Sequence, residues 1–177
     1  ELREEALRLG FDLVGVSPAV RPDGVDALRD WLGSDYCGEM QYMPRREDAY
    51  SHPEHVLPEV RSLVVVGLNY FNKDADRPEG PATGRIAKYA RGTVDYHDLL
   101  RARLKQLAGF LHDRKPGCRT RGVVDTAPLL ERDFAQRAGL GWFGKNTMLI
   151  NRKAGSWLFL AALLTDVALT PDEPHHT

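Results

Sequence analysis

The chain has 177 residues, with 24 Lys and Arg against 25 Asp and Glu, and 42% of its residues are hydrophobic. This length predicts a single domain, 1–177, large enough to bury a core without metal or disulfide staples. No apolar run approaches the ~20 residues that a bilayer requires, so we expect no membrane segment; two cysteines, Cys37 and Cys118, are too few for a disulfide framework and favour a reducing, cytoplasmic compartment.

The net charge near zero hides an uneven distribution. Residues 1–84 carry 9 basic and 16 acidic side chains, residues 85–121 carry 10 and 3, and residues 122–177 carry 5 and 6. The middle segment, at +7, suits a polyanion such as RNA, because each cation near a phosphate releases counterions. The same charges could equally form a solvated helix face.

The first half of the chain predicts three helices, one of them short, and two strands. Leu2, Ala6 and Leu9 lie at helical spacing before Gly10, which is typical of a helix end. Alternating polarity predicts a strand over 11–16. The other expectations are a helix over 23–32 capped by Asp23, a short helix and turns over 38–60, a central apolar strand over 62–70 and a loop over 72–83.

The second half predicts crossover helices and a late hairpin. An apolar stripe of leucines and Phe110 predicts a helix over 95–114, followed by a short strand over 122–125. Pro128 is expected in the first turn of a helix over 128–138, before a glycine-rich loop over 139–146. Strands over 147–151 and 157–166, joined by 152–156, predict an antiparallel hairpin. Together these elements predict an α/β fold with a mixed sheet and helices on both sides.

The glycine-rich loop matches a phosphate-binding loop only in part. The run from Gly139 to Lys145 has the spacing G-x4-G-K, but Asn146 stands where Ser or Thr would hold magnesium. The loop also follows a helix and opens a strand, which reverses the required context. We therefore expect either a backbone that approaches a ligand closely beside Trp142 and Phe143, or a plain helix terminus, and no nucleoside triphosphate site.

The sequence predicts no metal site made of side chains. Asp95 and His97 begin a D-x-H-x-x-G pattern that places histidine on cobalt in some enzymes, but Leu100 replaces its glycine. Asp95 is more simply a helix cap. His52 and His55 lack a second pair of ligands for zinc, and two cysteines cannot hold an iron–sulfur cluster, which takes four ligands.

Asp125 is the candidate acid that the residues themselves indicate. It ends an apolar strand and precedes a helix, a position where open sheets carry functional groups. An exposed aspartic acid, with a pKa of ~3.9, is almost wholly ionised at pH 7. Proton donation would require burial to raise that pKa by roughly three units. The alternative is that Asp125 only caps the following helix.

Three segments carry a resemblance to a known family: 39–46 (EMQYMPRR), 88–104 (KYARGTVDYHDLLRARL) and 123–166 (VVDTAPLLERDFAQRAGLGWFGKNTMLINRKAGSWLFLAALLTD). They resemble the cobalamin-binding domain of the epoxyqueuosine reductases, which complete queuosine in the tRNA anticodon loop. The resemblance covers essentially the whole chain. It implies a nitroreductase-like mixed sheet flanked by helices, a fold shared with the reductive dehalogenases.

The resemblance also implies a cofactor site. Asp125 would be the proton donor near the upper face of base-off cobalamin, and Arg45 would contact the corrin through its guanidinium. The ring would rest, largely on backbone groups, against Lys145, Asn146, Thr147 and Leu149 and the strand around Leu160. Cobalamin would carry out the reductive step on the epoxide, while the protein supplies orientation, an acid and a dry pocket.

Members of that family continue beyond this domain. Two ferredoxin-like motifs with [4Fe–4S] clusters follow, and commonly a helical-repeat tail. The present sequence stops at Thr177 and starts with Glu1 instead of Met, so we expect a fragment of a longer parent. The expected partners are a tRNA anticodon stem-loop containing epoxyqueuosine and an electron donor, either external or in a downstream domain.

Two other functions stay open at this point. A reductive dehalogenase-like enzyme acting on small organohalides would carry an export signal and have no tRNA affinity. A non-catalytic corrinoid-binding module would tolerate any change at Asp125. The fold type alone also allows a flavin, which a visible absorption spectrum would distinguish from cobalamin.

Overall fold

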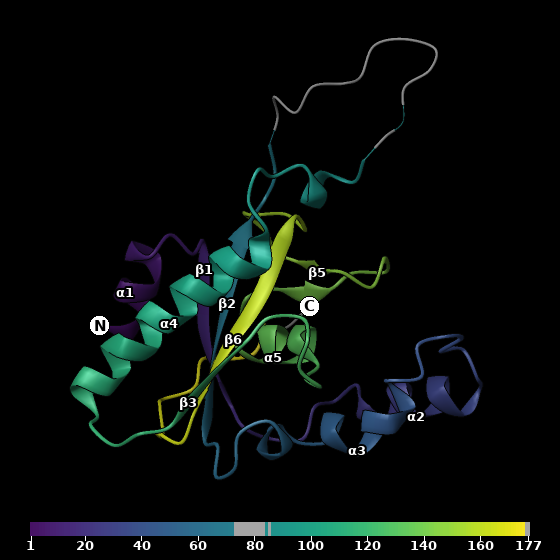
Figure 1. Cartoon of the computed structure of the whole chain (residues 1–177), viewed down its shortest axis with the longest axis horizontal. Coiled ribbons are helices and arrows are strands. Elements are labelled where there is room, and N and C mark those ends of the chain that lie inside the picture. Colours follow the sequence, from purple (N-terminus) through teal and green to yellow (C-terminus); the bar gives the residue numbers. More distant parts are fainter. Residues whose placement is uncertain (73–83, 85, 176–177) are drawn as a thin grey trace.

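The computed structural model describes residues 1–72, 84 and 86–175. Within that part of the chain, a four-stranded sheet carries helices on both faces (Figure 1). The strands lie in the spatial order β1 (Leu13–Pro18), β2 (Ser62–Asn69), β6 (Leu158–Thr165), β3 (Thr120–Val123). The predicted α/β class with helices on both sides is confirmed.

The helices occur in the predicted order. They are α1 (Leu2–Arg8), α2 (Val25–Gly33), α3 (Glu47–Tyr50), α4 (Tyr96–Arg114) and α5 (Glu131–Arg137), with 3-10 turns at Pro44–Arg46, Pro53–His55 and Lys88–Ala90. None of those described is both long and apolar enough to cross a bilayer. The loop expected over 72–83 lies, apart from Asn72, outside the described residues.

Strand pairing departs from the predicted mixed sheet. Each neighbouring pair among the four described strands is antiparallel: β1 with β2, β2 with β6, and β6 with β3. β2 and β3 run in the same direction and are joined by α4, as a crossover requires. However, β6 inserts between them, so no parallel neighbours result.

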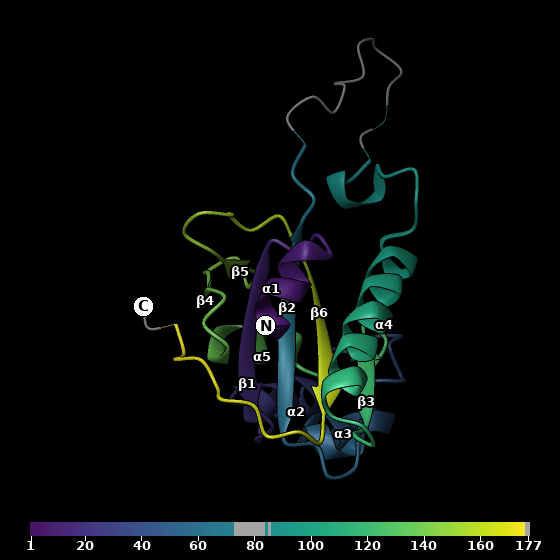
Figure 2. The same ribbon diagram turned by 90° about the vertical axis from the view of Figure 1, so that its left-hand side faces the viewer.

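The central strand β2 is buried on both faces. Val64 and Val66 pack toward α1 and α4, whereas Leu63 and Val65 pack toward α5. The ribbons of these helices and of β2 can be followed in Figure 2. All four side chains are completely covered. Successive side chains of a strand point to opposite faces, which explains why a strand covered twice reads as a continuous apolar run.

Helix ends agree with the sequence predictions at some positions only. The Asp95 carboxylate caps α4 by accepting a hydrogen bond from the backbone N–H of His97 at 2.9 Å. α2 begins after Gly24 without a side-chain cap, so the predicted role of Asp23 is wrong. α5 begins after Leu130, later than expected from Pro128, also without a side-chain cap. Asp125 therefore does not cap α5.

The predicted hairpin of 147–151 with 157–166 is wrong. β5 (Leu149–Ile150) pairs with β4 (Trp142–Phe143) in a separate small sheet, and β6 joins the main sheet. Gly141 permits this close pairing, since a Cβ there would lie 2.2 Å from the carbonyl oxygen of Ile150. The expected glycine-rich loop therefore contains a strand and opens no helix, as the phosphate-loop comparison anticipated.

Glycine at position 15 is required by the packing of β1 against the end of α5. An added Cβ would lie 2.1 Å from the backbone oxygen of Ala138. We expect Gly15→Ala to lower the free energy of unfolding by about 1–3 kcal/mol, as overpacking does. At Gly109 in α4, an added Cβ would have no atom within 4 Å outside the backbone of its own helix. Gly109→Ala should therefore raise the free energy of unfolding by about 0.5–1 kcal/mol. Urea unfolding of both variants measures these free energies. Equal changes in the two variants would contradict the close contact between position 15 and Ala138.

Candidate functional site

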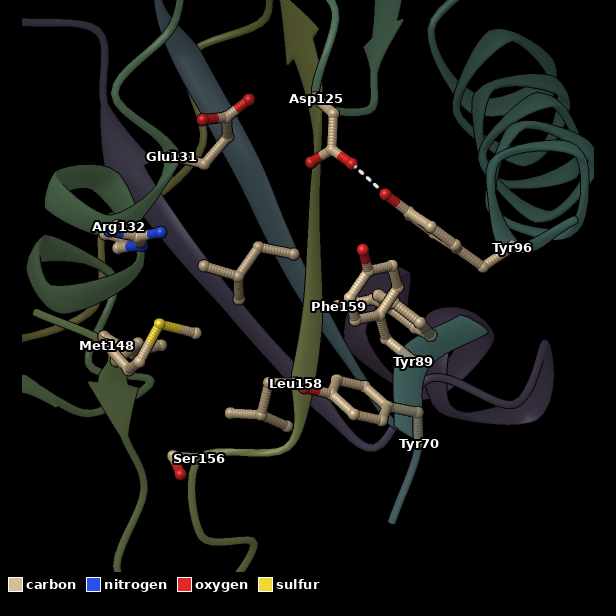
Figure 3. A pocket seen from close by; sticks show the side chains of 12 residues that line it. Tyr70, Tyr89, Tyr96, Asp125, Glu131, Arg132, Met148, Ser156, Leu158 and Phe159 are labelled. Carbon is tan, nitrogen blue, oxygen red and sulfur yellow. Dashed lines mark hydrogen bonds between the residues drawn. The ribbon is translucent and has the colours of Figure 1, made fainter. Parts of the chain in front are cut away.

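A cavity of about 250 Å³ lies at the ends of the strands that run in parallel (Figure 3). Tyr70 follows β2, Asp125 follows β3, and Tyr96 begins the helix that connects the two strands. Its apolar surface is formed by Met148, Leu149, Leu158, Phe159 and Leu160. The crossover thus places residues from distant parts of the sequence around one hollow.

A sharp turn after β3 directs Asp125 toward this cavity. Its φ of +51° lies in the left-handed region, which aspartate tolerates better than most residues. The backbone N–H of Thr126 donates to the oxygen of Val124, and the Arg46 guanidinium donates to the oxygen of Thr126 at 3.4 Å. The Asp125 side chain is 50% exposed. The deep burial that would make it a neutral acid by itself is therefore absent.

Two aromatic side chains at the start of α4 hold the Asp125 carboxylate. The Tyr96 hydroxyl donates a hydrogen bond to Oδ2 of Asp125, and Nε2 of His97 lies 3.3 Å from the same oxygen. Burial, reinforced by that bond to Asp125, raises the pKa of Tyr96 far above its ordinary value. Tyr96 therefore stays protonated and acts as a donor.

His97 bridges two carboxylates. Its Nδ1 lies 2.8 Å from Oδ1 of Asp95, opposite the contact of Nε2 with Asp125. The imidazole also stacks on Tyr96, with ring centroids 4.0 Å apart. Neither ring nitrogen is free for a metal. Across the described residues, no three His, Cys, Asp or Glu side chains gather in a way that could hold a metal ion.

A second carboxyl group, Glu131, lines the same cavity. Its Oε1 is fully covered and has no hydrogen-bond partner in the described structure. Burial raises the pKa of Glu131 to about 7, and the charge of Asp125 contributes to the rise. Neighbouring Arg132 does not neutralise it by pairing, since its guanidinium donates to the backbone oxygen of Thr147 at 3.0 Å.

The sequence motifs did not indicate that Glu131 or the aromatic residues Tyr70, Tyr89, Tyr96 and Phe159 line this site. A signal for Glu131 was present: it lies three residues before Phe134, which is completely buried, and such residues share a helix face. The tyrosines had no comparable signal, because their positions depend on how loops after β2 and before α4 converge.

The structure brings together only part of the predicted site. Leu149 and Leu160 line the cavity with Asp125, as expected from residues on which a ring would rest. The residues Lys145, Asn146 and Thr147 lie in the exposed turn between β4 and β5, outside the cavity lining. Arg45 is exposed in the turn at Pro44–Arg46 and also lies outside the lining.

A larger cavity adjoins the first. It measures about 640 Å³ and shares the walls Tyr70, Tyr89, Tyr96 and Phe159 with it. Lys88 and Arg91 add positive charge to its lining. A cofactor the size of cobalamin exceeds the smaller cavity, but the two hollows share walls and both have apolar lining, so together they offer more room than either alone.

Comparison with known proteins gives a consistent family resemblance. The family model described as "Epoxyqueuosine reductase QueG, DUF1730" matches residues 51–126. An epoxyqueuosine reductase of Gloeobacter violaceus is 42% identical over 179 residues, covering 99% of this chain and 54% of the relative. The chain thus spans about half the length of the relatives it matches.

Solved structures agree with this resemblance. An epoxyqueuosine reductase bound to an epoxyqueuosine-modified tRNA stem loop matches with a TM-score of 0.87 and 32% identity, over 99% of this chain and 47% of that one. The Bacillus subtilis epoxyqueuosine reductase, solved with an aspartate-bearing catalytic loop swung out of its active site, matches with a TM-score of 0.84 and 29% identity, over 99% and 47%. A reductive dehalogenase linked to B12-dependent dehalogenation, 21% identical with a TM-score of 0.56 over 98% and 20%, shows likeness of fold alone.

The raised pKa of Glu131 makes stability depend on pH. Because the folded-state pKa is about 7 against an ordinary value of 4.5, the protonated form favours folding. Its contribution is complete below pH 4.5 and is lost as the pH rises through 7. We expect wild type to lose about 3 kcal/mol of unfolding free energy relative to Glu131→Gln across this range. Urea unfolding at several pH values measures this difference, and parallel curves for the two proteins would contradict it.

Proposed function

We propose that this chain, a homologue of the epoxyqueuosine reductases over about half of their length, forms the cobalamin-binding domain of an enzyme that reduces epoxyqueuosine to queuosine in tRNA. The observation that carries the proposal is the placement of Asp125, held by Tyr96 and His97 at the rim of an apolar hollow. For a reductive ring opening, the protein must supply an acid beside the substrate and an apolar surface on which the cofactor rests.

The residues that would hold cobalamin are in part those on the cavity floor. Leu149 and Leu160 offer apolar contact for a flat ring, and Lys145, Asn146 and Thr147 offer backbone groups from the adjacent turn. Arg45 would reach the cofactor's amide or phosphate groups from outside the cavity. When bound, base-off cobalamin would supply low-valent cobalt, an electron-rich centre for the reductive step.

Asp125 would deliver a proton to the epoxide oxygen as a C–O bond breaks. Tyr96 fixes the carboxyl group through its hydroxyl, and His97, between Asp95 and Asp125, holds it from a second side. The aspartate-bearing catalytic loop of the Bacillus subtilis relative supports the same role for the loop that carries Asp125.

Electrons would come from outside these 177 residues. The two cysteines of the chain are fewer than the four ligands of a [4Fe–4S] cluster. The proposal therefore includes a donor with iron–sulfur clusters, either in the rest of a longer parent or in a separate protein, and a cytoplasmic location where tRNA is modified.

The basic segment supports a tRNA partner only through part of its charge. Arg103 donates to the backbone oxygen of Gly10, and Arg114 and Arg119 form ion pairs with acidic residues of the chain. Lys88 and Arg91, together with Arg103, line the larger cavity beside the site, where their positive charge suits a phosphate group. A dehalogenase function has no comparable support, since the likeness to that enzyme is one of fold.

The role of Asp125 as an acid predicts a defined loss. In the full-length protein, Asp125→Asn should keep cobalamin, because the amide oxygen still accepts the bond from Tyr96. It should lower the rate of epoxide reduction by about 10²- to 10⁴-fold, the usual contribution of a general acid. Single-turnover assays on an epoxyqueuosine stem-loop measure the rate, and visible absorbance measures the cofactor.

The matched control is Asp98→Asn, which removes an equal charge from an exposed position in the first turn of α4, the helix that begins with Tyr96. It should leave the rate unchanged. An Asp125→Asn protein with the wild-type rate would show that Asp125 is not the acid. An unfolded one would assign Asp125 to structure, and a wild type that binds cobalamin but reduces no epoxide would assign the chain to a non-catalytic corrinoid-binding role.

Arg45 offers a separate test of cofactor binding. Loss of one charge-assisted hydrogen bond costs about 1.5–3 kcal/mol, so Arg45→Ala should weaken cobalamin binding by about tenfold or more. The control Arg21→Ala, an exposed arginine paired with Asp26, should have no effect. Equilibrium dialysis of cobalamin against the full-length protein decides the matter; equal retention by both variants would remove Arg45 from the site.

A further inference from the structure

The reduction proposed above consumes more protons than Asp125 alone can hold. Converting an epoxide to an alkene breaks two C–O bonds, forms one C=C bond and releases water, with two electrons from a low-potential iron–sulfur donor and two protons. The first proton converts the departing oxygen to a hydroxyl group, and the second converts that hydroxyl group to water. Both protons reach the same oxygen atom within one turnover.

Few side chains in the cavity can release a proton near neutral pH. Among the described residues that line it, the candidates are Asp125 and Glu131. The tyrosines ordinarily lose a proton only near pH ~10, and burial raises the pKa of Tyr70 and Tyr96 further. Arg132 keeps its charge throughout.

The carboxyl groups of Asp125 and Glu131 belong to the same part of the cavity. Figure 3 shows Glu131 and Asp125 at the same end of the cavity, away from Ser156 and Tyr70 at the other end. The Oε1 atom of Glu131 is covered and unpartnered, whereas Asp125 is 50% exposed and already holds Tyr96. One carboxyl group is therefore half exposed and held by a donor, and the other has a covered oxygen without a hydrogen-bond partner.

We propose that Glu131 is the proton reserve of this cavity, which recharges Asp125 between the two C–O cleavages of a single turnover. Glu131 acts through Asp125 and does not contact the substrate. After product leaves, solvent restores its proton. The proposal rests on the proposed function and adds a residue to which the comparisons assign no role.

The groups around Glu131 are consistent with a reserve that is filled before turnover. Burial, together with the charge of Asp125, raises its pKa to about 7, while a hydrogen bond from its own backbone and the charge of Arg132 oppose the rise. From α3, Tyr50 faces it as a neutral phenol whose own pKa is raised by burial and by Glu131, while Arg46 acts on that phenol in the opposite direction. A carboxylic acid in this setting is substantially protonated at neutral pH and gives up its proton readily.

The test uses the full-length protein loaded with cobalamin, a reductant and an epoxyqueuosine stem-loop. Glu131→Gln keeps the shape and removes the acidic proton, and Glu131→Asp keeps the acid. The matched control is Asp133→Asn in the same helix: burial also raises the pKa of Asp133, but Asp133 accepts a hydrogen bond from the backbone of Gly24 at 2.6 Å and lines a different cavity.

Two readouts are expected to change together. Single-turnover rates should fall about 100-fold in Glu131→Gln and lose the decline that wild type shows above pH 7, while Glu131→Asp recovers part of the rate. Infrared titration without substrate should show a protonated carboxyl band that disappears near pH 7, is missing in Glu131→Gln and is retained in Asp133→Asn.

Unchanged rates and an unchanged pH profile in Glu131→Gln, with wild type active, would overturn the inference. So would the absence of any carboxyl band that this substitution removes. If Glu131→Gln fails to fold, a Glu131→Asp protein that lacks both the band and the pH dependence at full activity overturns it equally. An inactive wild type would instead refute the proposed function, and the inference with it.

Discussion

The bond from the Tyr96 hydroxyl to the Asp125 carboxylate is the contact on which the site depends. It joins the start of α4 to the loop that follows β3, two segments that the crossover brings to one end of the sheet. That position exists because β2 and β3 run in the same direction with β6 between them. The aromatic stack of Tyr96 on Phe159, with centroids 4.0 Å apart, anchors the same bond to the central sheet.

The cavity separates two carboxyl groups by environment. Asp125 is half exposed and held by donors, while Glu131 has a covered oxygen without a partner. Burial favours the neutral form of a carboxyl group, and it raises the pKa of Glu131. Pairs of titratable groups with opposed environments are typical of sites that move protons. The sequence pattern pointed to Asp125 as the buried acid, whereas in the structure Glu131 has that character.

The sequence predicted the fold where local signals were strong. The apolar run of β2, the leucine stripe of α4 and the cap at Asp95 all appear as expected, since each depends on neighbours within one element. Predictions failed where distant segments compete. The pairing of β5 with β4 could not be read from 147–166, because it depends on the glycine at position 141 approaching Ile150.

The candidate site likewise combines residues that the sequence indicated with residues that only tertiary packing brings to it. Asp125 was indicated by its position after a strand, and Leu149 and Leu160 were predicted from resemblance to a family; all three line one cavity. Arg45 lies outside that lining, and its neighbour Arg46 contacts the Asp125 loop instead. Glu131 and the tyrosines escaped notice because burial of a polar group is a property of tertiary packing, which hydrophobic periodicity does not encode.

The central claim is that a corrin ring packs against Leu149 and Leu160 with one face toward Asp125. A crystal structure of the full-length protein with bound cobalamin tests it most directly. The account predicts the ring against those two leucines, with the Asp125 carboxyl group over the cobalt. A ring bound elsewhere on the chain, or an Asp125 side chain on the far side of the ring from the substrate cavity, would contradict it.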